Sequence, residues 1–175
     1  IGRSATPNRL AQIARPVQGL GDLDSDRRSA RLRRSRGVGR YAGDPGDLAV
    51  VFDAKRRFLA IGLYDPTSPL RLRVLQQGTP ATIDHAWFRN KLESAATLRA
   101  PLLAMQTTGY RLVHGENDGL PGLVIDRYDQ TLVLKLYTAA WLPHLSELLA
   151  ALAVVQPAER LVLRMSRAVQ KAPQS

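Results

Sequence analysis

The sequence contains no cysteine. This absence excludes a disulfide framework, a cysteine-ligated zinc site and a cysteine nucleophile within the 175 residues. Long apolar runs are also missing, and none approaches the roughly 20 residues that a membrane-spanning helix needs. Residues 1–8 lack the basic-then-apolar pattern of a signal peptide. We therefore expect a cytoplasmic protein that does not enter a membrane.

Acidic residues are scarce: 15 Asp and Glu stand against 25 Lys and Arg, and the net charge is +10. Ten arginines and only three aspartates give residues 1–40 a charge of +7. An excess of this kind favours a polyanionic partner, chiefly nucleic acid. We take Arg33, Arg34 and Arg36 as candidate phosphate contacts that need no sequence preference. The alternative is that this basic segment is simply solvated.

Hydrophobic residues make up 45% of the chain, which is enough for a packed core. Residues 1–40 form a basic segment without periodicity, which we expect to be disordered until it meets a partner. Residues 41–78 contain three short strand patterns, at 48–52, 58–64 and 70–75, separated by turn residues. This spacing predicts a small β-barrel.

The last of these strand patterns alternates apolar and basic residues. Alternation with a period of two predicts that Val74 and the leucines face inward, while Arg71 and Arg73 share the opposite face. With Tyr64 close in sequence, the two arginines would offer charge and a stacking surface to RNA. An exposed polar face without a ligand is the alternative.

Residues 79–175 predict a helix followed by an α+β domain in the order strand-strand-strand-helix-strand, with the helix on one face of the sheet. Asp84 is the expected N-cap of the first helix, and Pro101 should end or kink that helix. Trp87 and Trp141 are expected in the core, and His144, at a helix start, on the surface. The expected elements are a helix over 85–104, strands over 110–113, 123–125 and 132–137, a helix over 142–155 and a strand over 160–165.

The densest motif is residues 111–128, RLVHGENDGLPGLVIDRY. Its glycines and its proline predict a tight, fixed loop between strands. Glu116, Asn117 and Asp118 most simply bond backbone amides within this turn. An acid/base or metal site that also uses His114 is the alternative, but a single histidine without a second ligand cluster makes metal binding a poor choice.

Residues 114–128 closely resemble the central domain of bacterial 23S rRNA cytosine-C5 methyltransferases. Residues 58–75 resemble the end of the N-terminal PUA domain of that family, a small RNA-binding barrel. The two matches occur in the family's order, and the resemblance covers about residues 41–165. It singles out one loop of the central domain: His114, Glu116, Asn117, Asp118, Gly119, Pro121 and Gly122.

The resemblance implies a third domain, which in the family binds S-adenosylmethionine and carries the catalytic residues. We expect that domain to be absent here, because nothing follows Ser175. Residues 37–42 fit a GxGxxA pattern, but no buried strand precedes them and no helix is expected to follow, so they do not predict a cofactor loop. Methylation at cytosine C5 also needs a thiolate nucleophile, which this sequence cannot supply. We expect no catalytic, cofactor or metal site in this chain.

The family also opens with a histidine-proline-aromatic stretch where this chain has residues 33–37, which puts the completeness of the barrel in doubt. The leading interpretation is an RNA-binding part of a 23S rRNA methyltransferase, inactive on its own. One alternative is a full methyltransferase of which this chain is one part. Another is a non-catalytic module that pairs with a second protein or with its own copy as a homodimer.

Overall fold

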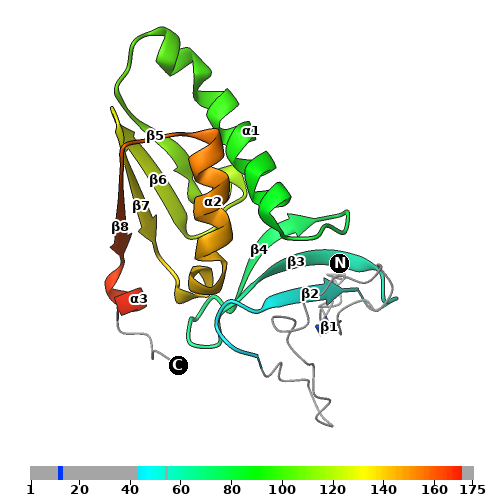
Figure 1. Ribbon diagram of the computed structural model, residues 1–175. Helices are drawn as coiled ribbons and strands as arrows, with labels where there is room; N and C mark the ends of the chain where they lie inside the picture. Colours follow the sequence, from blue (N-terminus) through cyan, green and yellow to red (C-terminus); the bar gives the residue numbers. More distant parts are fainter. Residues whose placement is uncertain (1–11, 14–42, 54, 171–175) are drawn as a thin grey trace, which may run out of the picture.

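The computed structural model describes residues 12–13, 43–53 and 55–170, and within them it has two four-stranded sheets (Figure 1). The first sheet is antiparallel throughout, in the order β1-β2-β3-β4. Its strands are β1 (Gln12–Ile13), β2 (Leu48–Phe52), β3 (Phe58–Tyr64) and β4 (Leu72–Gln77). The sequence predicted three short strands separated by turn residues in this region, and β2, β3 and β4 are these strands.

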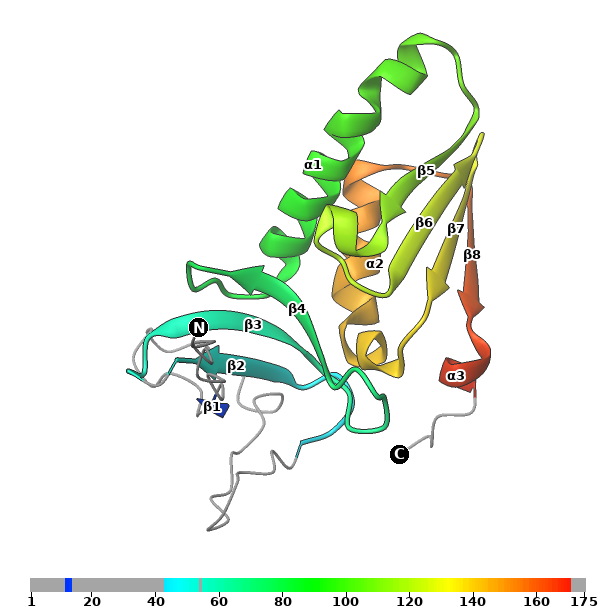
Figure 2. The same cartoon turned by 180° about the vertical axis from the view of Figure 1, so that it is seen from behind.

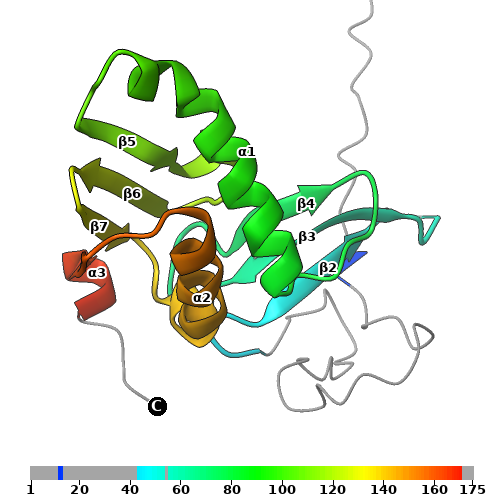
Figure 3. The same cartoon turned by 45° about the horizontal axis from the view of Figure 1, so that its top comes forward.

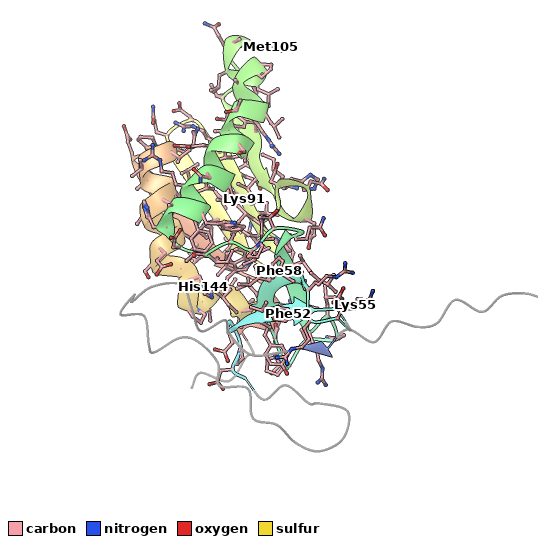
Figure 4. The ribbon with its side chains drawn as sticks, turned by 90° about the vertical axis from the view of Figure 1, so that its right-hand side faces the viewer. Phe52, Lys55, Phe58, Lys91, Met105 and His144 are labelled. Atoms are coloured by element: carbon pink, nitrogen blue, oxygen red, sulfur yellow. The ribbon has the colours of Figure 1, made fainter. Side chains whose placement is uncertain are left out.

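The turn between β2 and β3 shows how the sequence closes this hairpin. The Asp53 carboxylate accepts hydrogen bonds from the backbone amides of Lys55 and Arg57, each at 2.9 Å. Just beyond the turn, the rings of Phe52 and Phe58 pack edge to face with centroids 6.4 Å apart. Figure 4 shows the two phenylalanines at the ends of their strands and Lys55 in the turn beside them. The polar residues at 53–57 therefore form the turn, and the apolar residues on both sides form the strands.

The second sheet has the order β5-β6-β7-β8, with β8 parallel to β7 and the other pairs antiparallel. Helices α1 and α2 cover one of its faces (Figures 1 and 3). The elements from α1 onward are α1 (His85–Ala104), β5 (Gly109–His114), the short helix η1 (Gly115–Asp118), β6 (Leu123–Tyr128), β7 (Thr131–Leu136), the short helix η2 (Ala139–His144), α2 (Leu145–Val155), β8 (Arg160–Met165) and α3 (Arg167–Gln170).

One hydrophobic core joins the two sheets. Ile61 and Leu63 of β3 and Leu75 of β4 belong to the same buried cluster as the helix-facing residues of the second sheet. Phe88 of α1 lies at its centre, between Trp87 and Trp141, with ring centroids at 5.4 and 6.1 Å. Figure 3 shows α1 running from the first sheet toward the loop that leads into the start of β5. The core therefore fixes the first sheet against the second.

The α+β class and the strand-strand-strand-helix-strand order are as predicted. Asp84 caps α1, since its carboxylate accepts the amide of Trp87 at 2.9 Å, and both tryptophans are buried. The helix does not end at Pro101 but continues to Ala104. Proline lacks only its own amide hydrogen, so the amides of the residues after it can still donate to helix carbonyls. No helix among the described residues has the length and apolar character needed to cross a membrane.

Candidate nucleic-acid interface

Arg73 lies on a different side of β4 from the one that the alternation predicted. Leu75 is an extra residue in a β-bulge, between the paired positions Val74 and Gln76. The bulge reverses the alternation before it, since two residues of one strand there oppose one of the other. Val74 is therefore 41% exposed, and Arg73 is half-buried opposite the fully buried Leu63. The prediction that Val74 faces inward is wrong.

The side chain of Arg73 packs at the contact between the two sheets. A Cβ atom placed on Gly122, in the loop before β6, would lie 3.7 Å from both Cδ and Nε of Arg73. The buried Nε of Arg73 has no hydrogen-bond partner among the described residues, and its guanidinium reaches Ser68 Oγ only at 3.5 Å. Arg71, by contrast, is exposed. Of the two arginines, Arg71 is thus the one whose charge is presented to solvent.

Tyr64 is buried, with only 4% of its surface exposed. It is the last residue of β3, pairs with Leu72 of β4, and its backbone amide donates to the carbonyl of Asp47. A base can stack only on a ring face that is open, so the stacking surface predicted at Tyr64 is not available in this structure. The sequence could not show this, because the exposure of a residue at a strand end depends on how the folded chain packs around it.

Two buried polar contacts hold the sheets together across long sequence separations. The hydroxyl of Thr138 donates to Asp65 Oδ2 at 2.5 Å, and Nε2 of His144 lies 2.7 Å from the carbonyl oxygen of Gly46. His144 is 6% exposed, so its predicted surface position is wrong. Figure 4 shows it beside the lower end of α2, where the chain of the first sheet passes.

The carboxyl group of Asp65 is kept ionised by its hydrogen bonds. Burial favours the neutral form and would raise the pKa of Asp65, but donors from Thr138 and Thr67 and the charge of Arg73 outweigh it and hold the pKa below its ordinary value. The donors are the Thr138 hydroxyl and, at 2.8 and 3.1 Å, the hydroxyl and amide of Thr67. Asp65 thus organises the loop after β3 and ties it to the start of η2.

Asp118 anchors the glycine-rich loop to α1. Its two carboxylate oxygens accept from the two terminal nitrogens of Arg99, both at 2.7 Å, and the Asp118 and Arg99 side chains are 3% and 16% exposed. Asp118 Oδ2 also accepts the backbone amide of His114 at 2.6 Å. The predicted bond from this carboxylate to a turn amide is confirmed. The partner arginine was not predicted, since it lies 19 residues away on a helix.

The second half of the motif is held by backbone contacts. The carbonyl of Pro121 accepts the indole N–H of Trp141 at 2.9 Å inside the core. Gly119, which follows η1, and Gly122 have φ angles of 72° and 73°, a left-handed conformation that favours glycine. Most of the motif therefore builds a rigid turn between β5 and β6.

Three residues in the loop of the motif, from the last residue of β5 onward, point outward instead. His114, Glu116 and Asn117 are exposed, and Asn117 Nδ2 lies 3.3 Å from Nδ1 of His114. A ligand could reach these three side chains of the loop. Among the described residues there is no group of three or more His, Cys, Asp or Glu side chains that could hold a metal ion.

Arg33, Arg34 and Arg36 lie outside the described residues, as does the GxGxxA pattern at 37–42. The described part offers one strand-helix-strand crossover, β7-α2-β8, where a cofactor loop could be sought. That loop has Thr138 as the cap of η2: its hydroxyl accepts the amide of Ala140 at 3.2 Å and is 3% exposed. The residues between β7 and α2 include no glycine, the residue that lets a phosphate or nucleoside approach the backbone of a cofactor loop.

Sequence reasoning missed a group of basic and aromatic residues on the second sheet. Arg111, Tyr128, Lys135 and Arg164 come from four different strands. The alternating pattern of each strand was a usable signal, but it does not say which residues of neighbouring strands are side by side. That information comes only from the register.

A comparison with protein-family models matches residues 30–77 to a family described as a PUA-like domain. Curated relatives are large-subunit ribosomal RNA methyltransferases. One from Deinococcus radiodurans is 56% identical over 130 residues, covering 71% of this chain and 32% of the relative. One from Tolumonas auensis, a ribosomal RNA large subunit methyltransferase I, is 34% identical over 157 residues, which are 85% of this chain and 40% of the relative. The chain thus spans about a third of the length of these relatives.

Solved structures share the fold at low sequence identity. A Streptococcus mutans protein assigned as a SAM-dependent methyltransferase superposes with a TM-score of 0.61 and 17% identity, covering 70% of this chain and 34% of that one. The protein SMU.776, assigned as a methyltransferase and complexed with SAH, superposes with a TM-score of 0.58 and 19% identity. The match covers 65% of this chain and 30% of that one. These structures support the arrangement of the two sheets.

Proposed function

We propose that this chain is the RNA-binding part of an S-adenosylmethionine-dependent 23S rRNA cytosine-C5 methyltransferase, and that it positions the rRNA. The observation that carries the proposal is the 56% identity over 130 residues to a large-subunit ribosomal RNA methyltransferase. The PUA-like match at residues 30–77 supports a role in RNA contact. In this proposal the chain binds RNA, and methyl transfer belongs to a part of the relatives that this chain does not match.

Charge is the chemistry that this chain brings to the substrate. Arg33, Arg34 and Arg36 lie within the PUA-like match, and Arg71, the residue before β4, is exposed. Such groups bind phosphates and release counterions, which makes the affinity fall as salt rises. Arg73 contributes differently, by packing between the two sheets and fixing their relative orientation. Tyr64 has no part in this proposal.

The chain's own residues do not account for the methyl transfer. Cytosine C5 methylation needs a thiolate that adds to the ring, and the sequence has no cysteine. In the strand-helix-strand crossover of the second sheet, Thr138 caps η2 and no glycine lies between β7 and α2. S-adenosylmethionine, where the relatives use it, would supply the methyl group from a site that these residues do not form.

An electrophoretic mobility shift with a fragment of large-subunit rRNA at several salt concentrations tests the proposal. We expect a shifted complex at low salt that weakens as salt rises. Absence of a complex even at low salt would overturn it. A calorimetric titration with S-adenosylmethionine is the companion measurement, and we expect no heat of binding. Micromolar binding of the methyl donor by this chain would contradict the division of roles.

A further inference from the structure

The outer face of the second sheet is the face that α1 and α2 do not cover. In β7, Leu132, Leu134 and Leu136 are buried toward the helices, so Lys135 and its alternate neighbours project to the other side. Figure 2 views the sheet from behind, and no described helix crosses it there. We call this surface the outer face.

Strand register brings basic residues from neighbouring strands together on the outer face. Lys135 of β7 pairs directly with Arg164 of β8, and Arg111 of β5 pairs with Asp126 of β6. Asp126 is bonded to Arg111 at 2.7 Å, which neutralises the acid. Lys135 and Arg164 have no carboxylate within ion-pair distance among the described residues. Two uncompensated positive charges therefore lie side by side.

Two exposed tyrosines border these charges. Tyr128, the last residue of β6, is 57% exposed, and its ring leans over Gly109, where a Cβ atom would lie 3.6 Å from it. Tyr137, just after β7, is 45% exposed, and Lys135 Nζ lies 4.7 Å from its ring centroid. Exposed rings beside cations are the combination on which unpaired bases stack while phosphates are neutralised.

The apolar residues of β8 favour RNA over a protein as the occupant of this face. Leu161, Leu163 and Met165 pair with the buried leucines of β7, so they point to the helix side of the sheet. On the outer face β8 presents Arg160 and Arg164, and the valine between them, Val162, pairs with Val133 of β7. Cations flank this small apolar strip, whereas the core of a protein interface is depleted of charged residues.

We propose that the outer face binds unpaired RNA, with Lys135 and Arg164 on phosphates and Tyr128 and Tyr137 stacking on bases. This inference rests on the proposed function, because it places a second RNA contact on the same protein. It adds a surface that the PUA-like region does not provide, on the other sheet. RNA held at both sheets would be fixed in orientation as well as bound.

The test is fluorescence anisotropy of the full chain with a labelled RNA oligonucleotide of about 12 nucleotides, unpaired or annealed to its complement. The charge variant is K135Q/R164Q, and its matched control is R89Q/K91Q, which removes two positive charges from α1 on the helix side. The stacking variant is Tyr128→Ala, and its control is Tyr128→Phe, which keeps the ring. Circular dichroism spectra establish that each variant is folded.

We expect K135Q/R164Q to weaken binding about tenfold and to lower the slope of log affinity against log salt by about 1.4, at roughly 0.7 for each single-strand phosphate. Tyr128→Ala should weaken binding of the unpaired RNA by roughly 5- to 160-fold, leave the salt slope unchanged and affect the duplex little. Both controls should bind like the unchanged chain.

Three other results would overturn the inference, and they can be told apart. If the unchanged chain binds RNA and both outer-face variants bind equally well, the outer face is not the site, and the proposed function stands. Equal loss of duplex and unpaired RNA in Tyr128→Ala would exclude base stacking. If the unchanged chain binds neither RNA at low salt, both the inference and the proposed function fail.

Discussion

Asp65 shows how a single carboxylate can join two sheets. It accepts hydrogen bonds from Thr67 beside it and from Thr138, which lies 73 residues further along the chain. Buried and bonded to three donors, it is more than the turn residue that an Asp-Pro-Thr sequence suggests. Its long-range partner could not be predicted, because nothing in the local sequence marks Thr138 as its donor.

Replacing Asp65 should therefore destabilise the whole fold. We expect Asp65→Ala to lower the free energy of unfolding by about 1–3 kcal/mol at neutral pH, because buried donors lose their acceptor. Urea unfolding measures this loss. The exposed Asp129, replaced by Asn, is the control and should change little. Asp65→Ala with unaltered stability would contradict the structural role.

The same residue gives a pH dependence with a defined sign. The folded-state pKa of Asp65 is depressed, so its contribution is present above the unfolded-state value and is lost as the pH falls through the folded-state value. The stability gap between the unchanged chain and Asp65→Ala should thus narrow when unfolding is measured below about pH 4. A gap that widens in acid would show that the neutral carboxyl is the stabilising form.

Asp118 and Arg99 form a buried ion pair at the glycine-rich loop. Removing one partner leaves a buried charge without compensation, which typically costs about 3–5 kcal/mol. We expect Asp118→Asn to approach this loss in urea unfolding, while keeping the acceptor for the His114 amide. The double variant R99M/D118N should be more stable than Asp118→Asn alone. If the double variant loses as much unfolding free energy as the two single variants together, the two side chains are not coupled, which would contradict the pairing.

At the scale of elements, most of the fold follows from local patterns. The strands β2, β3 and β8 and the helix α1 have the bounds that their periodicity predicted. The bulge at Leu75 did not follow, because it depends on how β4 pairs with β3. It reverses the faces of Arg73 and Val74, and β4 itself spans Leu72–Gln77 rather than the predicted 70–75.

The loop between η1 and β6 depends on Gly122. Its φ angle is 73°, and an added Cβ atom would lie 3.2 Å from Cγ2 of Thr138. We expect Gly122→Ala to lower the unfolding free energy by about 1–2 kcal/mol from backbone strain alone, and further from crowding. Gly78→Ala is the control, since Gly78 has a φ of 78° and open space around it. Thermal unfolding of both variants separates backbone strain from crowding by Thr138. Equal losses of stability in the two variants would exclude crowding.

At the scale of the whole molecule, the two sheets share one core and orient two surfaces. The resemblance in the sequence indicated the class of protein, and the relatives agree with it. The outer face of the second sheet follows from the register of its strands, and the burial of Tyr64 is a property of the folded chain. Local sequence thus predicts which residues are basic or aromatic, whereas exposure depends on contacts between distant segments.

The central claim, that this chain holds ribosomal RNA by charge, is tested most directly by its dissociation constant for a large-subunit rRNA fragment over a series of salt concentrations. We expect log affinity to fall linearly with log salt, with a slope of about −2 or steeper, which corresponds to several neutralised phosphates. The variant R33Q/R34Q/R36Q should have a shallower slope. A chain that binds no RNA at low salt, or whose affinity is independent of salt, would contradict the claim.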